Sequence, residues 1–328
     1  MNKASSSTFD PAAPSVAGMS LLSAGPARQV GVEVEFTGLR ASAAARALQA
    51  GLGGHLVQED PHAFSVHGSR LGDLSVQLDV RYVHPQAHNA SLPLRMGRWS
   101  AALLGHVLAG FVPRELILSP LPVQRLAEVD GAVAILREAG ARGRGRTRFG
   151  SLGLHFNIGL FRLDVTTILA FLRAFLLLEP WLRRETAGEV GRAMFMPGSF
   201  PRTYVRQVMA PDYRPDLVAF TDDYLRANPT RDRALDLLPV LQHFDEARVR
   251  ARLPYEKIGS RPALHYRLPR AFVGEPGWSM MPAWNRWLAV ERLAEDPNRL
   301  AALSSAYLRF DGSENAWLQL AQVHNGTG

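Results

Sequence analysis

The chain contains no cysteine, and it has almost no lysine. Without cysteine it forms no disulfide bond or thiolate metal site and has no cysteine nucleophile. The GxxxxGK[ST], HExxH and GxSxG motifs are also missing, so nothing supports a P-loop NTPase, a zincin or an α/β-hydrolase. Because Lys3 and Lys257 are the only lysines, the formal net charge of +7 comes almost wholly from arginine. This charge favours anionic partners such as nucleotides, acidic metabolites or nucleic acid, although arginine bias can also reflect genome composition.

Long apolar runs are scarce as well. The most apolar stretch, residues 163–178, contains Asp164 and Arg173 and is too short to span a bilayer, which predicts a core helix. Residues 1–27 are rich in serine, proline and alanine, and Asp10 interrupts any charged-then-apolar pattern. That pattern predicts a disordered tail on a cytoplasmic protein, not a secretory signal.

The order of expected elements predicts an α+β domain built on a mostly antiparallel sheet. Strands are expected at 28–37, 64–67, 74–82, 113–119, 152–160 and 261–268. Helices are expected at 41–52, 98–110, 125–139, 278–295 and 297–310, with a helical region over 165–252 that is interrupted by Pro197, Pro201, Pro211, Pro215 and Pro239. No linker divides the chain, so we expect a disordered tail (1–27), one domain (28–312) with a helical insertion at about 163–252, and a C-terminal tail (313–328).

The first expected strand carries two carboxylates on one face. In GVEVEF (31–36), Val32, Val34 and Phe36 alternate with Glu33 and Glu35. On a strand the two glutamates point the same way, only about 6–7 Å apart. Like charges that close repel, and each raises the pKa of the other unless a positive charge lies between them. The pattern indicates either a solvated outer face or a bound cation.

The other expected strands repeat this alternation of polar and apolar side chains. Their polar faces include Gln77, Asp79 and Arg81; Glu115; His155 and Asn157; and Arg261, His265 and Arg267. A half-buried sheet with a solvated face produces the same alternation without any function. Such a face usually carries Lys, Thr, Ser and Gln, however, whereas Glu, Asp and His bind cations and Arg binds phosphate. The combination across strands therefore favours a site for a cation and a phosphate.

Several of these segments resemble the putative amidoligase family over about residues 28–310. The matching segments are GVEVEFTGL, LGDLSVQLDVRY, ELILSPLP, GLHFN and RPALHYRLP. This family belongs to the carboxylate–amine ligases of glutamine synthetase-like, or glutamate–cysteine ligase-like, fold. The resemblance implies a curved, mostly antiparallel sheet with helices on one face, an inserted helical lobe, and ATP and Mg²⁺ on the polar concave side. It also implies joining of a small-molecule or peptide carboxylate to an amine or ammonia through an acyl phosphate, sometimes beside a glutamine amidotransferase.

The resemblance also implies roles for individual residues. The metal ligands would be Glu33, Glu35, Glu115, His155 and His265. The ATP-binding residues would be His155, Asn157, Arg261, Arg267 and Arg146. The residues acting on the reacting groups would be Arg261, Arg267 and Asp79. Related enzymes carry acidic residues at position 265 and near position 77, where this chain has histidine and glutamine, so we expect one or two metal ions instead of three.

Alternatives remain at three points. His155 is also compatible with a packed core histidine, and Asp79 with a simple ion pair to Arg81. The arginine–glycine segment 141–148 fits a solvated loop, a loop closing over ATP, or a nucleic-acid contact; the lack of interleaved aromatic residues makes the last the weakest.

The competing function is a catalytically inactive, basic binding protein of the same fold that contacts nucleic acid or acidic polymers. No membrane partner is expected.

Overall fold

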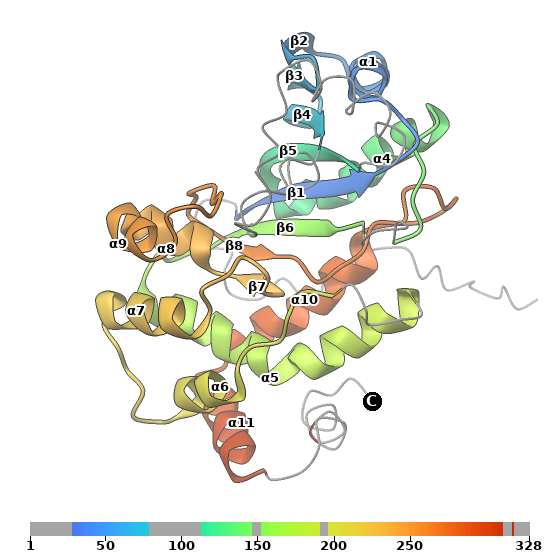
Figure 1. Ribbon diagram of the computed structural model, residues 1–328. Coiled ribbons are helices and arrows are strands. Elements are labelled where there is room, and N and C mark those ends of the chain that lie inside the picture. Colours follow the sequence, from blue (N-terminus) through green and yellow to red (C-terminus); the bar gives the residue numbers. More distant parts are fainter. Residues whose placement is uncertain (1–27, 79–112, 146–151, 191–195, 311–316, 318–328) are drawn as a thin grey trace, which may run out of the picture.

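The computed structural model describes residues 28–78, 113–145, 152–190, 196–310 and 317. These residues form an α+β structure around an open eight-stranded sheet (Figure 1). The strands are β1 (Gln29–Phe36), β2 (His55–Asp60), β3 (Ala63–Ser69), β4 (Gly72–Leu78), β5 (Arg114–Pro122), β6 (Leu154–Gly159), β7 (Leu235–Asp236) and β8 (Ala263–Tyr266). Their order across the sheet is β2-β3-β4-β5-β1-β6-β8-β7, and every neighbouring pair of these strands is antiparallel.

Nine α-helices accompany the sheet within the described residues. They are α1 (Ala41–Leu52), α4 (Val129–Glu138), α5 (Val165–Val190), α6 (Arg202–Met209), α7 (Leu217–Ala227), α8 (Leu238–Phe244), α9 (Glu246–Arg252), α10 (Met281–Ala294) and α11 (Pro297–Arg309). A 3₁₀-helix, η4 (Val123–Glu128), precedes α4. Figure 1 shows α7, α8 and α9 together at one side of the molecule, beside β7 and β8.

The apolar face of the sheet forms the core. In β1 the residues Val30, Val32, Val34 and Phe36 are fully buried, as their alternation with polar residues predicts. Helix α1 packs over β3 and β4. The face it buries is largely alanine, and these small side chains let the helix approach the sheet closely. The β1 alternation therefore separates a hydrocarbon face from a polar one.

Aromatic side chains attach α5 and α10 to the other half of the apolar face. The Tyr266 ring of β8 lies 4.9 Å from that of Trp287 and 6.1 Å from that of Phe175, centroid to centroid. Phe156 of β6 lies 5.4 Å from Trp284 in an edge-to-face contact. Aromatic pairs at these separations stabilise a core beyond the area they bury. The β6–β8 half of the sheet is thus fixed to α10 and α5, which are its neighbours in Figure 1.

Most of the expected elements are confirmed, and three details are wrong. The edge strand β2 was not expected, because its sequence, HLVQED, is mostly exposed and lacks a buried alternating face. The two-residue strand β7 interrupts the region expected to be helical, and it is too short to give a periodic signal. The segment expected as one helix over 125–139 begins as 3₁₀-helix η4. Helix α5 continues through Pro180. The expected helix over 98–110 lies outside the described residues.

Helix α5 extends beyond the apolar stretch 163–178 that predicted it. Within the described residues, one helical segment, Val165–Gly188, is long and apolar enough to cross a bilayer. The prediction that this stretch is too short to span a bilayer is therefore wrong. However, 67% of its most apolar window is buried inside the protein, as in a core helix, which passes the same test. The expected core helix is confirmed by this burial.

The aromatic packing leads to a stability prediction. Trp287 is fully buried between Phe171 and Tyr266. We expect Trp287→Ala to lower the free energy of unfolding by about 3–5 kcal/mol, because it leaves a large cavity. The matched control is Tyr255→Ala, which removes an 81% exposed ring and should change stability by no more than about 0.5 kcal/mol. Urea unfolding measures both variants, and equal effects would contradict this account of the core.

Candidate active site

The strand register brings the polar side chains together on one face of the sheet. Between β1 and β6, Glu33 lies directly opposite His155. Between β1 and β5, Glu35 lies opposite Glu115. His265 of β8 lies opposite Asn157 of β6. Since directly opposed residues point to the same face, four strands contribute to one polar surface.

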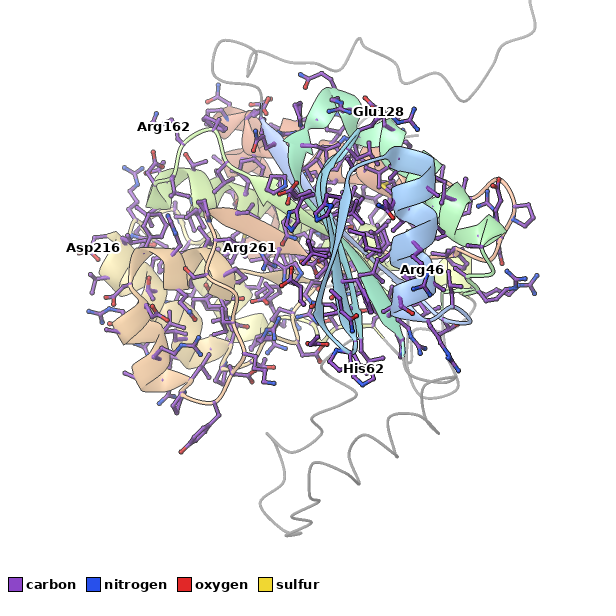
Figure 2. All side chains as sticks on the ribbon, turned by 90° about the horizontal axis from the view of Figure 1, so that it is seen from above. Arg46, His62, Glu128, Arg162, Asp216 and Arg261 are labelled. Carbon is purple, nitrogen blue, oxygen red and sulfur yellow. The ribbon has the colours of Figure 1, made fainter. Side chains whose placement is uncertain are left out.

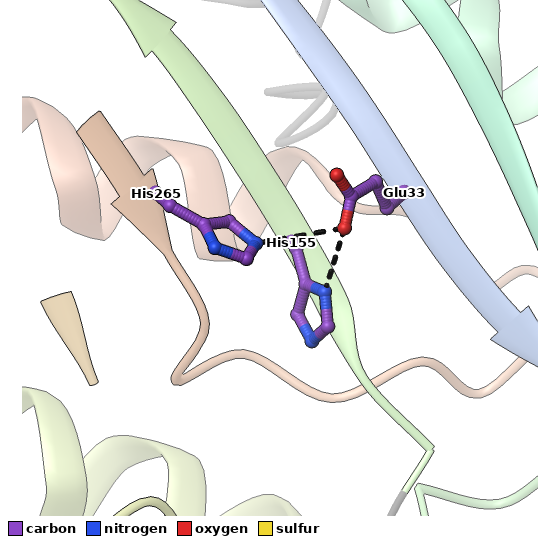
Figure 3. Close-up of side chains that lie close together, drawn as sticks. All are labelled: Glu33, His155 and His265. Atoms are coloured by element: carbon purple, nitrogen blue, oxygen red, sulfur yellow. Dashed lines mark hydrogen bonds and ion pairs between the residues drawn. The ribbon is translucent and has the colours of Figure 1, made fainter. Parts of the chain in front are cut away.

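Glu33 is at the centre of this surface. One carboxylate oxygen, Oε2, is 3.1 Å from Nδ1 of His155 and 3.5 Å from Nε2 of His265 (Figure 3). The other, Oε1, accepts a hydrogen bond from Nδ2 of Asn157 at 2.8 Å and lies 3.4 Å from Nη2 of Arg261. Only 12% of the Glu33 side chain is exposed. A nearly buried carboxylate is thus surrounded by four nitrogen-bearing side chains.

Two further carboxylates lie near His155. Its Nε2 is 4.0 Å from Oε1 of Glu35, and its Nδ1 is 3.9 Å from Oε1 of Glu115. The other oxygen of Glu35 accepts a hydrogen bond from the backbone N–H of Gly153 at 2.9 Å. The ring nitrogens of His155 therefore lie within 4.0 Å of three carboxylates.

The protonation states of Glu33 and His155 follow from their burial and from the groups around them. Burial alone would raise the pKa of Glu33, but His265 and His155 outweigh it and hold that pKa well below its usual value. Burial lowers the pKa of His155 well below its usual value. Near neutral pH, Glu33 is therefore ionised and His155 is neutral. An ionised carboxylate only accepts hydrogen bonds, so His155 donates from Nδ1 and keeps a lone pair on Nε2, toward Glu35.

These residues fit a divalent cation. Glu33, His155 and His265 form one group whose candidate ligand atoms all lie within 4.8 Å of one another, and Glu35, Glu115 and His155 form another. Carboxylate oxygens suit Mg²⁺ and Mn²⁺, and neutral imidazole nitrogens suit Mn²⁺ and softer divalent ions. The buried Oδ1 of Asn157, beside Glu33, has no hydrogen-bond partner among the described residues. The donor set is thus suitable for a metal, and it retains an unused oxygen.

Arg261 precedes β8 and Arg267 follows it, and their side chains have different surroundings. Arg261 is 30% exposed and reaches Glu33 directly. Seen from above, Arg261 and helix α1, which carries Arg46, lie on opposite sides of the strands (Figure 2). Arg267 is buried, donates to the carbonyl oxygen of Arg231 at 2.9 Å, and has its Nη1 3.7 Å from Oδ2 of Asp236. Of these two arginines, Arg261 is therefore the one placed beside Glu33.

Most of the residues expected at the site are brought together. The cluster contains Glu33, Glu35, Glu115, His155, Asn157, Arg261 and His265, with Arg267 joined to it through Asp236. Asp79 and Arg146 lie outside the described residues, as does Arg81. The interpretation of His155 as a packed histidine is correct about its burial, but the ring faces carboxylates.

Sequence reasoning missed two residues of the site. Asp236 is fully buried in β7, directly opposite His265. Its signal in the sequence was a single carboxylate between leucines in ALDLLP, inside a segment read as helical. Gly153 donates to Glu35 and leaves room for the imidazole of His155. A lone glycine next to a strand carried no signal for that role.

One family model matches the chain. The family is described as a putative amidoligase enzyme, and its model covers residues 26–289, which includes every residue of the cluster. No curated protein matches the chain.

Gly153 gives a prediction about the site. A Cβ at this position would lie 2.3 Å from Nε2 of His155, so Gly153→Ala forces the buried imidazole out of place. We expect a loss of about 1–3 kcal/mol in unfolding free energy, together with shifted His155 ring resonances in NMR spectra. The matched control is Gly131→Ala on α4, where no atom lies within 4 Å and alanine favours the helix. An unshifted His155 ring in the Gly153 variant would contradict the packing described here.

Proposed function

Because the chain belongs to the amidoligase family, we propose that the cluster around Glu33 is the active site of an ATP- and Mg²⁺-dependent carboxylate–amine ligase. The observation that carries the proposal is the grouping of carboxylates, neutral imidazole and a guanidinium on one nearly buried strand face within the matched region. The wide antiparallel sheet with its polar face supports a glutamine synthetase-like architecture. The substrates would be a small-molecule or peptide carboxylate and an amine or ammonia.

The proposed reaction needs activation of the carboxylate, because its direct leaving group would be oxide. Transfer of the γ-phosphoryl group of ATP to a carboxylate oxygen gives an acyl phosphate and ADP. The amine then attacks the acyl carbon, and phosphate leaves as the amide forms. Phosphoryl transfer depends mainly on positioning and charge neutralisation.

The residues of the cluster supply that positioning. Glu33, Glu35 and Glu115, with His155 and His265, would hold Mg²⁺, which neutralises phosphate oxygens when bound. Arg261 is partly exposed beside Glu33, where its guanidinium would contact the γ-phosphate. Arg267 would add positive charge behind His265. Asp79 and Arg146 remain predictions, as amine-site and ATP-binding residues.

The partners and the location also remain predictions. A glutamine amidotransferase would supply ammonia, and the enzyme would work in the cytoplasm without a membrane or nucleic-acid partner.

Binding of ATP tests the proposal first. We expect ATP with Mg²⁺, at about a hundred times its Kd, to stabilise the protein by about 2.7 kcal/mol, visible as a raised melting temperature. The shift should require Mg²⁺ and vanish in Glu33→Gln/Glu35→Gln. The matched control, Glu59→Gln/Glu138→Gln, removes two exposed carboxylates and should keep the full shift.

Two results would contradict the proposal. One is the absence of any ATP-dependent shift in folded wild-type protein. The other is affinity for duplex DNA that falls steeply with salt and ignores Glu33 and Glu35, which would favour the catalytically inactive binding protein.

Arg261 gives a second test, by way of the reaction itself. In ATP-dependent amide formation with a carboxylate–amine pair found by screening, we expect Arg261→Ala to lower kcat by about 10²–10³-fold, the usual cost of one transition-state donor. Arg46→Ala removes an exposed arginine on the opposite side of the sheet and should leave kcat unchanged. Equal rates in the two variants would exclude a role for Arg261 in phosphoryl transfer.

A further inference from the structure

His265 lies between two carboxylates. Its Nε2 is 3.5 Å from Oε2 of Glu33, and its Nδ1 is 3.5 Å from Oδ2 of Asp236. The residue is 2% exposed, so these two carboxylates replace water on either side of the ring. In this arrangement, one ring nitrogen faces the candidate metal site and the other faces away from it.

The carboxylate of Asp236 has a fixed orientation. Asp236 is completely buried, and the β7–β8 register places it directly opposite His265. Its Oδ1 accepts a hydrogen bond from the backbone N–H of Leu238 at 3.0 Å. The other oxygen, Oδ2, therefore points toward Nδ1 of His265. Nη1 of Arg267 lies 3.7 Å from the same oxygen. Among the described residues, Oδ2 and both ring nitrogens of His265 are buried without a hydrogen-bond partner of standard geometry, so the 3.5 Å contact is the one open to this oxygen and Nδ1.

We infer that Asp236 is a positioning residue: it holds the Nδ1 proton of His265 and so directs the Nε2 lone pair toward Glu33 and the cation site. A neutral imidazole has one N–H and one lone pair, and the group facing one nitrogen decides which is which. Histidines that bind metals commonly donate their other N–H to a carboxylate, which fixes both tautomer and ring orientation. The link to a cation rests on the proposed function, whereas the position of the proton does not.

The tautomer of His265 can be read directly by imidazole ¹H–¹⁵N NMR at about pH 8, with His265→Gln used to assign the signals. We expect Nδ1 to carry the proton in the wild type. In Asp236→Asn, the amide oxygen can keep the Leu238 hydrogen bond, so the NH₂ group faces Nδ1 and donates to it. The proton of His265 should then move to Nε2. A wild-type Nδ1 without a proton, or an unchanged tautomer in the variant, would overturn the inference.

Mg²⁺ affinity, measured by calorimetry, gives the second readout. We expect Asp236→Asn to weaken Mg²⁺ binding by about 10–100-fold, the range found when a partner of a metal ligand is removed. The matched control, Asp212→Asn, alters an exposed carboxylate and should bind Mg²⁺ like the wild type. An Asp236 variant with normal Mg²⁺ affinity would overturn the inference even if its melting temperature fell, because Asp236 would then serve only to pair with Arg267.

The two readouts separate this inference from the proposed function. Wild-type protein that binds no Mg²⁺ would contradict the proposed function, while the tautomer would still decide the role of Asp236. If Asp236→Asn does not fold, the wild-type spectrum alone decides the same question.

Discussion

The ionised carboxylate of Glu33, nearly buried in the middle of the sheet, is the constraint on which the rest of the site depends. A buried charge is costly unless it is paired and hydrogen-bonded. Its partners come from β6, from β8 and from the segment leading into β8. A one-residue slip of β1 against β6 would turn Glu33 into the hydrocarbon core and remove all of these partners. The register of β1 against β6 thus supplies the partners of the Glu33 carboxylate, and the cost of burying that carboxylate unpaired disfavours any other register.

The polar face does not by itself hold the fold together, since it concentrates like charges at close range. Stability comes from the opposite face, where β1 buries valines and Phe36, and Tyr266 packs on Trp287 and Phe175. Aromatic and aliphatic burial at these positions contributes roughly 1.5–3 kcal/mol for each large side chain, before the entropy of ordering is subtracted. The two faces of the sheet therefore differ in role: the apolar face provides the stability, and the polar face carries the closely spaced charges of the candidate active site.

Sequence reasoning succeeded on β1 and β6, where polar and apolar side chains alternate. The alternation in GVEVEF placed Glu33 and Glu35 on one face, and the period-two pattern in GLHFN placed His155 and Asn157 beside them. It failed at β7, because a two-residue strand has no period and Asp236 becomes important only through its pairing with β8. It also could not set the order of strands across the sheet, which results from long-range pairing and decides which side chains meet.

Position 265, where the family resemblance implies an acidic residue, carries histidine in this chain, yet this part of the sheet keeps a carboxylate. Asp236 places a carboxylate directly behind His265, one strand further from Glu33. Before any contribution from the histidines, four carboxylates (Glu33, Glu35, Glu115 and Asp236) and two guanidinium groups (Arg261 and Arg267) sum to a formal charge of −2. One divalent cation balances that charge, so a second would need further anionic ligands, such as the phosphates of a nucleotide.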